Sequence, residues 1–242
     1  MWLNCDLGES FGAWTMGLDS EVMPYIDAAN IACGFHAGDP VVIAKTLSLA
    51  KQHNLKIGAH PSYPDKEGFG RRSMKLQPKE LINCLHYQIA AVEGMAKVQN
   101  VTLDYVKPHG ALYNDMMDDV ELLKIVMQAI SSYSNHLKLM MLATKQQDEH
   151  RLLASQYGIS LYFEAFADRL YTDEGKLVSR TKPNAVHDKE QVLIQVKQLA
   201  NNGCIITETG QMLYLEADTL CVHGDNLDGI TEMKKIKAML MS

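Results

Sequence analysis

The stretch PKELINCLHYQIAAVEGMAKVQNVTLDYVKPH, residues 78–109, contains the unit that decides the fold. In its first part apolar residues recur at three-to-four spacing, which predicts an α-helix with one buried face. The residues on that face are Leu81, Ile82, Leu85, Ile89, Val92 and Ala96. In its last part, residues 104–109 are typical of a short strand. A helix that leads into a strand in this way is typical of a parallel sheet, whose strands need crossover connections.

The same alternation of strand and helix runs along the whole chain. We expect strands at residues 2–6, 28–33, 56–60, 104–109, 137–143, 160–166 and 219–225. Such a series without any linker in 242 residues predicts a single domain, residues 1–242, built as one distorted, closed or nearly closed seven-stranded parallel β/α barrel. The alternative is a doubly wound open sheet. Residues 203–218 interrupt the alternation and predict an inserted β-hairpin that turns near Thr209 and Gly210.

Composition excludes several classes of protein. The chain is 47% hydrophobic and 21% charged, which is ordinary for a globular protein and unlike a disordered one. No apolar run approaches the ~18 residues of a membrane span, and the N-terminus lacks the pattern of a secretory signal. The net charge of −6 disfavours nucleic acid as a partner. The five cysteines include no Cys-x-x-Cys pair, which favours a reducing, cytoplasmic location over a disulfide framework.

Polar residues gather where the expected strands end. They are Asn4, Asp6, His36, Asp39, His60, Lys107, His109, Glu164, Asp168, Arg169, His223 and Asp225. In parallel α/β proteins these strand ends share one face of the molecule, and residues two apart on a strand point the same way. Because ionisable groups are costly to bury without a partner or a function, we expect one shared polar site.

Several of these residues have a structural role as the alternative. Asp39 precedes Pro40 at a helix start and is also a candidate N-cap, and His36 is also a candidate loop histidine bonded to backbone. Lys107 has the alternative of a solvated surface lysine. Arg71 and Arg72 lie in a long loop with glycines, where they could clamp a carboxylate or phosphate or simply be solvated. No phosphate-binding loop, dinucleotide fingerprint or Gly-x-Ser-x-Gly elbow is present, which favours acid–base or metal-assisted chemistry.

Seven motifs around these strand ends follow one another along the chain. They are NCDLGES (4–10), ANIACGFHAGDP (29–40), GAHP (58–61), GFGRR (68–72), VKPHGALYN (106–114), FADR (166–169) and CVHGD (221–225). Together they resemble the LamB/YcsF family, the A subunit of the bacterial ATP-dependent 5-oxoprolinase. The departures are small: Ser62 stands where glycine is expected, and Asn226 where threonine or serine is commoner.

The resemblance implies a barrel similar to the glycoside hydrolase/deacetylase superfamily. It also implies opening of the 5-oxoproline lactam to L-glutamate, coupled to ATP hydrolysis, with 5-oxoprolinase B and C subunits as partners. Because the chain has no phosphate-binding loop, we expect one of these partners to supply the ATP step.

Lactam hydrolysis needs an activated carbonyl, a positioned water and a proton for the leaving nitrogen. The candidate bases are Asp6 and Asp225, and the candidate acids are His36, His60 and His109. Lys107 and Arg72 are candidates to bind developing negative charge or the substrate carboxylate. Candidates for substrate binding also include Asn4, Asp39, Glu164, Asp168, Arg169 and His223.

Two alternatives remain open from the sequence. By analogy with the superfamily, the first is a metal-dependent, deacetylase-like amide or carbohydrate hydrolase. Its divalent ion, zinc or another first-row metal, would be bound by Asp6, His36 and His60. The second is a non-catalytic protein that binds the lactam.

Overall fold

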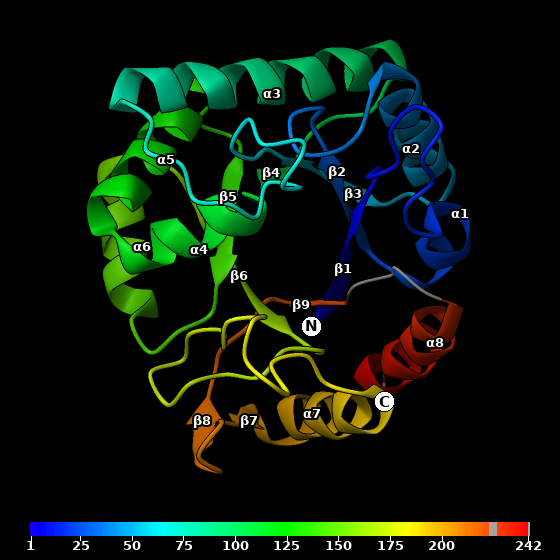
Figure 1. Cartoon of the computed structure of the whole chain (residues 1–242), viewed down its shortest axis with the longest axis vertical. Helices are drawn as coiled ribbons and strands as arrows, with labels where there is room; N and C mark the ends of the chain where they lie inside the picture. Colours follow the sequence, from blue (N-terminus) through cyan, green and yellow to red (C-terminus); the bar gives the residue numbers. More distant parts are fainter. Residues whose placement is uncertain (223–226, 242) are drawn as a thin grey trace.

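The strands close into a seven-stranded parallel barrel in the computed structural model, which describes residues 1–222 and 227–241 (Figure 1). The strands, in barrel order, are β1 (Trp2–Leu7), β2 (Ala28–Ala32), β3 (Lys56–His60), β4 (Tyr105–Val106), β5 (Lys138–Leu142), β6 (Leu161–Phe166) and β9 (Thr219–Cys221). Because β9 pairs with both β1 and β6, the barrel is closed and the open-sheet alternative is wrong.

Each strand expected from the sequence is present; most bounds differ by one residue at an end, and the strands expected at 104–109 and 219–225 are much shorter. Strand β4 ends at Val106, although the amides of Lys107 and His109 still donate to the carbonyls of Ala59 and Pro61 at 2.9 and 2.8 Å; Pro108 between them has no N–H to donate. The strand expected at 219–225 ends at Cys221. Residues 223–226, and with them the candidates His223 and Asp225, lie outside the described residues.

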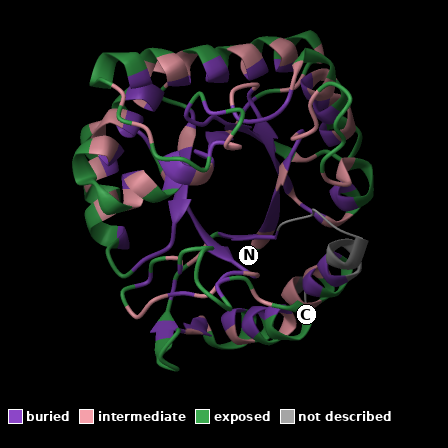
Figure 2. Ribbon diagram, viewed as in Figure 1, coloured by how far each residue is buried: buried purple, intermediate pink, exposed green. Residues whose placement is uncertain are grey.

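Helices surround the barrel and turn their buried faces toward it (Figure 2). They are α1 (Asp19–Val22), the short 3-10 helix η1 (Met23–Tyr25), α2 (Pro40–Gln52), α3 (Pro78–Val98), α4 (Gly110–Asp118), α5 (Val120–Tyr133), α6 (Gln147–Gln156), α7 (Lys189–Asn202) and α8 (Leu227–Met241). In α3 the face predicted from periodicity is the buried one, including Leu81, Leu85 and Ile89. In the described part of the chain, no helix is long and apolar enough to cross a membrane.

Residues 203–218 contain a β-hairpin outside the barrel. Strands β7 (Cys204–Ile206) and β8 (Met212–Tyr214) pair antiparallel, between α7 and β9. The chain reverses across Thr207–Gly210, where the amide of Gly210 donates to the carbonyl of Thr207 at 2.9 Å. The hairpin therefore leaves the parallel order of the barrel unbroken.

Residues two apart on the strands form layers inside the barrel. At the N-terminal end, Trp2 packs edge-on against Tyr162, with ring centroids 5.2 Å apart, beside Tyr105. A Cβ on Gly58 would overlap the Tyr105 ring, so glycine at this strand position makes room for the tyrosine. Above these aromatic rings the inward residues become polar, beginning with Asn4 and ending at the C-terminal strand ends.

Candidate active site

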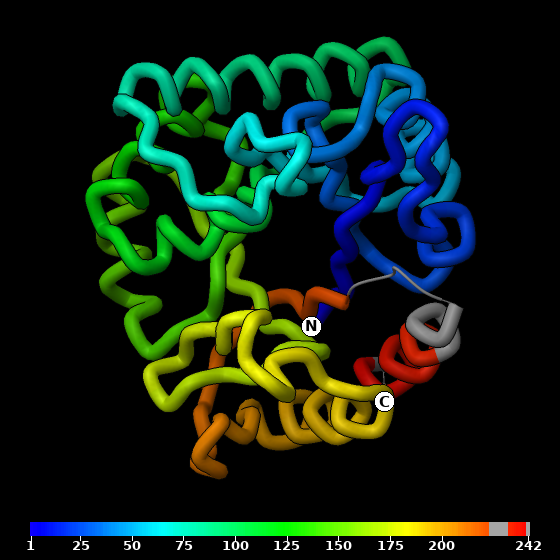
Figure 3. Tube along the Cα trace, viewed as in Figure 1, coloured from blue at the N-terminus to red at the C-terminus, as the bar shows by residue number. Residues whose placement is uncertain are grey.

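A cavity of about 560 Å³ opens at the C-terminal end of the barrel. Its volume falls within the range of small-molecule sites, ~300–1,000 Å³. The cavity is lined by four of the expected catalytic residues, Asp6, His60, Lys107 and His109. Two long segments lie on opposite sides of the barrel opening in Figure 3: the one between β3 and α3, and the one between β6 and α7. The first contributes Arg71 to the lining of the cavity, and the second contributes residues 176–181.

Lys107 is a buried cation held by carboxylates. Its Nζ lies 2.9 Å from Asp6 Oδ1 and 3.0 Å from Glu164 Oε2, and it donates to Asn4 Oδ1 at 3.3 Å. Burial opposes the charge, but Asp6, Cys221 and Glu164 outweigh it and raise the pKa of Lys107 well above its usual range. The residue is 2% exposed, so the alternative of a solvated surface lysine is wrong.

Asp6 lies between this cation and the histidines. Its Oδ1 accepts hydrogen bonds from Lys107 Nζ and, at 2.7 Å, from Asn30 Nδ2. Its Oδ2 lies 3.4 Å from His60 Nε2. Two donors to one oxygen fix the carboxylate and stabilise its charged form, while the other oxygen faces the histidines.

The ring orientations of two histidines are set by backbone carbonyls. His60 Nδ1 is 2.6 Å from the carbonyl oxygen of Lys107, and His109 Nε2 is 2.9 Å from that of Phe69. Because a carbonyl oxygen only accepts, each of these nitrogens carries the hydrogen. The two other nitrogens, His60 Nε2 and His109 Nδ1, face each other at 3.0 Å. If both rings are neutral, these two nitrogens direct their lone pairs toward each other.

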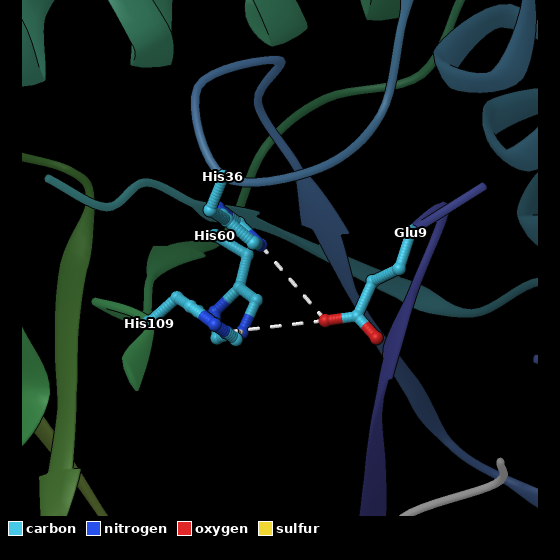
Figure 4. A group of neighbouring side chains, drawn as sticks. All are labelled: Glu9, His36, His60 and His109. Carbon is cyan, nitrogen blue, oxygen red and sulfur yellow. Dashed lines mark hydrogen bonds and ion pairs between the residues drawn. The ribbon is translucent and has the colours of Figure 1, made fainter. Parts of the chain in front are cut away.

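His36 completes a compact group with Glu9 (Figure 4). Its ring stacks on His109, with centroids 3.8 Å apart and planes 7° from parallel. Glu9 Oε1 lies 3.9 Å from both His36 Nε2 and His109 Nδ1. Burial, with the neighbouring histidines, lowers the pKa of His109 to about 3 and that of His36 well below its usual range. We call Glu9, His36, His60 and His109 the histidine–glutamate cluster.

Glu9 was not among the residues expected from the sequence. It lies beyond the end of β1, so the two-residue alternation that identified Asn4 and Asp6 does not reach it. Gly8, at φ 71°, changes the direction of the chain immediately before Glu9. The available signal was an acidic residue inside the NCDLGES motif. Asn30 was missed as well, although its position on β2 has the same inward parity.

The loop 68–72 is strained and packs on the histidines. Phe69 adopts φ 54°, which is unusual for a bulky residue, and its carbonyl accepts from His109. Gly70 has φ 64°, and a Cβ there would overlap Ser62 Oγ and come within 2.9 Å of His36 and His109. The left-handed φ values of Phe69 and Gly70 therefore accompany close packing of this loop on the histidine–glutamate cluster.

The structure corrects the expectation for Arg72. Its guanidinium pairs with Asp65 within the same loop, its side chain is 65% exposed, and it does not line the cavity. Arg71 lines the cavity instead. Successive residues in the loop point to different sides, which the sequence alone did not reveal.

Three further candidates for substrate binding lie away from the cavity. Asp39 caps α2, because its Oδ1 accepts from the amides of Val41 and Val42 at 2.8 and 2.9 Å. Asn4 and Glu164 are fully buried one layer below Asp6, where they contact Lys107. Their positions indicate that they support the site from below.

Of the remaining candidates Asp168, Arg169 and His36, only Arg169 lines the main cavity. Asp168 is half-buried and does not line the cavity. Arg169 does line it, but its guanidinium also donates to the carbonyls of Val178 and Ala185 at 2.7 and 3.3 Å. Burial, with the charge of Arg180, lowers the pKa of Arg169 to about 10. His36 lines a neighbouring pocket that shares Glu9 and Phe69 with the main cavity.

Comparison with known proteins identifies the family. The model of the LamB/YcsF family matches residues 1–242. The chain belongs to the LamB/YcsF family. It is 52% identical over 239 residues to the 5-oxoprolinase A subunit of Pseudomonas fluorescens strain Pf0-1, a match that covers 98% of this chain and 96% of that protein. It is 51% identical to the 5-oxoprolinase A subunit of Chromohalobacter salexigens, over 97% of this chain and 94% of that protein.

A solved structure of similar fold supports the same assignment. The lactam utilization protein from Thermus thermophilus is 35% identical, with a TM-score of 0.90, and the match covers 100% of this chain and 96% of that one. In this LamB/YcsF protein the barrel mouth combines a fixed carboxylate, a buried ammonium and histidine side chains. Such a set is suited to acid–base or metal-assisted chemistry on a polar substrate.

Proposed function

We propose that this chain is the A subunit of a 5-oxoprolinase, which opens the lactam ring of 5-oxo-L-proline to L-glutamate with hydrolysis of ATP. The observation that carries the proposal is the identity of about half of all residues, over nearly the full length, with proteins named as the A subunit of 5-oxoprolinase. The cavity at the barrel mouth supplies the chemical groups that such a reaction needs.

The cavity suits a small anionic lactam. 5-Oxoproline carries one carboxylate, and Arg71 and Arg180 line the cavity on different segments. Guanidinium groups bind carboxylates with paired, charge-assisted hydrogen bonds. The substrate carboxylate would therefore face the arginines, and the lactam carbonyl would face Asp6 and His60 on the barrel wall.

Asp6 is the proposed general base. Lys107 and Asn30 hold one of its oxygens, so the other could take a proton from a water that attacks the lactam carbonyl. His109 is poorly suited to be the general acid, because burial lowers its pKa to about 3 and the N–H of its neutral ring is already donated to the carbonyl of Phe69. The proton taken up by Asp6 would instead pass to the leaving ring nitrogen as the C–N bond breaks.

ATP and the B and C subunits complete the proposed reaction. Phosphorylation of the carbonyl oxygen by ATP would activate the stable amide, and one of those partners would supply that step, because this chain carries no phosphate-binding loop. A cytoplasmic location, where ATP is available, stays a prediction.

Reconstitution from purified proteins tests the proposal. The chain is assayed alone and with the B and C subunits, with 5-oxoproline and ATP, and both glutamate and ADP are measured. We expect glutamate and ADP in equal amounts from the complete mixture and neither from the chain alone. Amide hydrolysis by the chain alone without ATP would favour the metal-dependent hydrolase. Full turnover by a complex in which this chain carries Asp6→Asn would favour the non-catalytic protein that binds the lactam.

A further inference from the structure

The histidine–glutamate cluster presents an excess of buried lone pairs. The tautomers set by the carbonyls of Lys107 and Phe69 leave His60 Nε2 and His109 Nδ1 as two acceptors 3.0 Å apart. Two acceptors at that distance repel each other unless a positive charge lies between them. His36 is 1% exposed, and neither of its ring nitrogens has a hydrogen-bond partner among the described residues. A buried polar group in that state is costly.

A bound proton would remove the repulsion between the two acceptors but would not give the His36 nitrogens a partner. One proton between His60 and His109 would link that pair. It would leave both nitrogens of His36 without a partner and Glu9 Oε1 at 3.9 Å from His36 Nε2. A cation that contacts all four side chains would instead engage a ligand atom from each of them at once. We propose that the histidine–glutamate cluster binds one divalent first-row transition metal ion, such as Zn²⁺.

The spacing of the donor atoms fits such an ion. One ligand atom from each of the four side chains lies within 4.8 Å of the others. Tetrahedral ligands with Zn–N bonds of ~2.0–2.1 Å are about 3.3 Å apart. The two His–Glu separations of 3.9 Å and the His60–His109 separation of 3.0 Å are close to this value, and the widest separation in the cluster, up to 4.8 Å, has to contract when an ion binds. Imidazole nitrogens with one carboxylate oxygen are ligands that zinc and its neighbours prefer.

The surroundings of the cluster are those of a metal site. Ligating histidines usually donate their other N–H to a carbonyl or carboxylate, which fixes the ring, and the carbonyls of Lys107 and Phe69 accept these bonds here. The carbonyl that accepts from His109 belongs to Phe69, whose φ is 54°. Glu9 lines the cavity, so a bound ion would adjoin the substrate space, where it could polarise a carbonyl or lower the pKa of a water.

This ligand set differs from the one expected by superfamily analogy. That expectation was Asp6, His36 and His60; Asp6 Oδ2 does lie 3.4 Å from His60 Nε2, but the other carboxylate oxygen is held by Lys107 and Asn30. The described residues that can converge on an ion include Glu9 and His109 and leave Asp6 out. Asp6 thus stays available as a base beside the ion.

Metal binding to the isolated chain tests the proposal without substrate, ATP or partner proteins, so its result is separate from that of the proposed function. Metal is removed by dialysis against a chelator, Zn²⁺ is titrated by calorimetry, and the bound metal is counted by mass spectrometry. We expect one Zn²⁺ per chain. Glu9→Gln and His36→Gln should each lower the affinity for Zn²⁺ by more than about 100-fold. Removal of a residue that only supports a ligand costs roughly 10–100-fold, so a larger loss is the result expected of the ligands themselves.

Glu67→Gln is the matched control, because Glu67 borders the neighbouring pocket but its side chain is 85% exposed and outside the cluster. It should bind Zn²⁺ as the unchanged chain does. If His36→Gln does not fold, as judged by circular dichroism, Glu9→Gln decides, because that side chain is 19% exposed at the cavity wall. Failure of the unchanged chain to take up stoichiometric Zn²⁺, Mn²⁺ or Co²⁺ would overturn the proposal. Unaltered affinity in Glu9→Gln would overturn it as well.

Discussion

Replacing Lys107 by methionine should destabilise the protein severely. Methionine fills a similar volume but removes the cation that lies 2.9 Å from Asp6 and 3.0 Å from Glu164. Loss of one partner of a buried ion pair costs about 3–5 kcal/mol, because it leaves uncompensated buried charge. In a chain of this length each kcal/mol lowers the melting temperature by about 2–4 °C, so we expect a decrease of roughly 6–20 °C.

The reasoning assigns this cost to the carboxylates that remain, and a second substitution measures it. Adding Glu164→Gln to Lys107→Met removes one of the two buried charges and should restore about 1–3 kcal/mol. Urea unfolding followed by circular dichroism gives the free energy of each variant. Lys124→Met is the control, because Lys124 pairs with Glu121 on an exposed helix surface and should barely matter. If Lys107→Met is as stable as the control, or Glu164→Gln gives no rescue, the argument is refuted.

Three further predictions concern the cavity and its loop. Asp6→Asn should keep the fold and lower glutamate release by the reconstituted complex about 10²–10⁴-fold, the usual cost of losing a general base; retention of half the activity would refute the role. Gly70→Ala should lower the free energy of unfolding by at least ~1–2 kcal/mol, because of its left-handed φ and the contact with the histidines, and an unchanged urea midpoint would contradict this. Arg71→Ala should raise the KM for 5-oxoproline, whereas Arg72→Ala should leave it unchanged; equal effects in steady-state kinetics would contradict the assignment.

The sequence predicted the order of the strands and the end of the barrel that carries the site. Both depend on local periodicity, because alternation along a strand and the three-to-four spacing of a helix record which side chains are buried. In α3 the predicted apolar face is the buried one. Asp6, His60, Lys107 and His109 line one cavity, as expected from parallel strands that end on one face.

The sequence could not predict how deep in the barrel each inward-facing side chain lies. Asn4 and Asp6 have the same parity on β1, yet Asn4 is fully buried beneath the cavity, and Asp6 reaches it. Glu164 was expected to bind substrate but lies against Lys107, because it belongs to the same lower layer. The register between paired strands sets these levels, and register depends on contacts between residues far apart in the chain.

The loops were decided by tertiary structure alone. Glu9 meets three histidines from three other segments after the chain changes direction at Gly8. Arg71 faces the cavity, whereas the neighbouring Arg72 pairs with Asp65. Loop residues carry no periodicity that records their direction, since each φ is set by local turns and by what packs against them. The sequence by itself determined the barrel and the residue types at its mouth. The tertiary structure decided which of those residues meet.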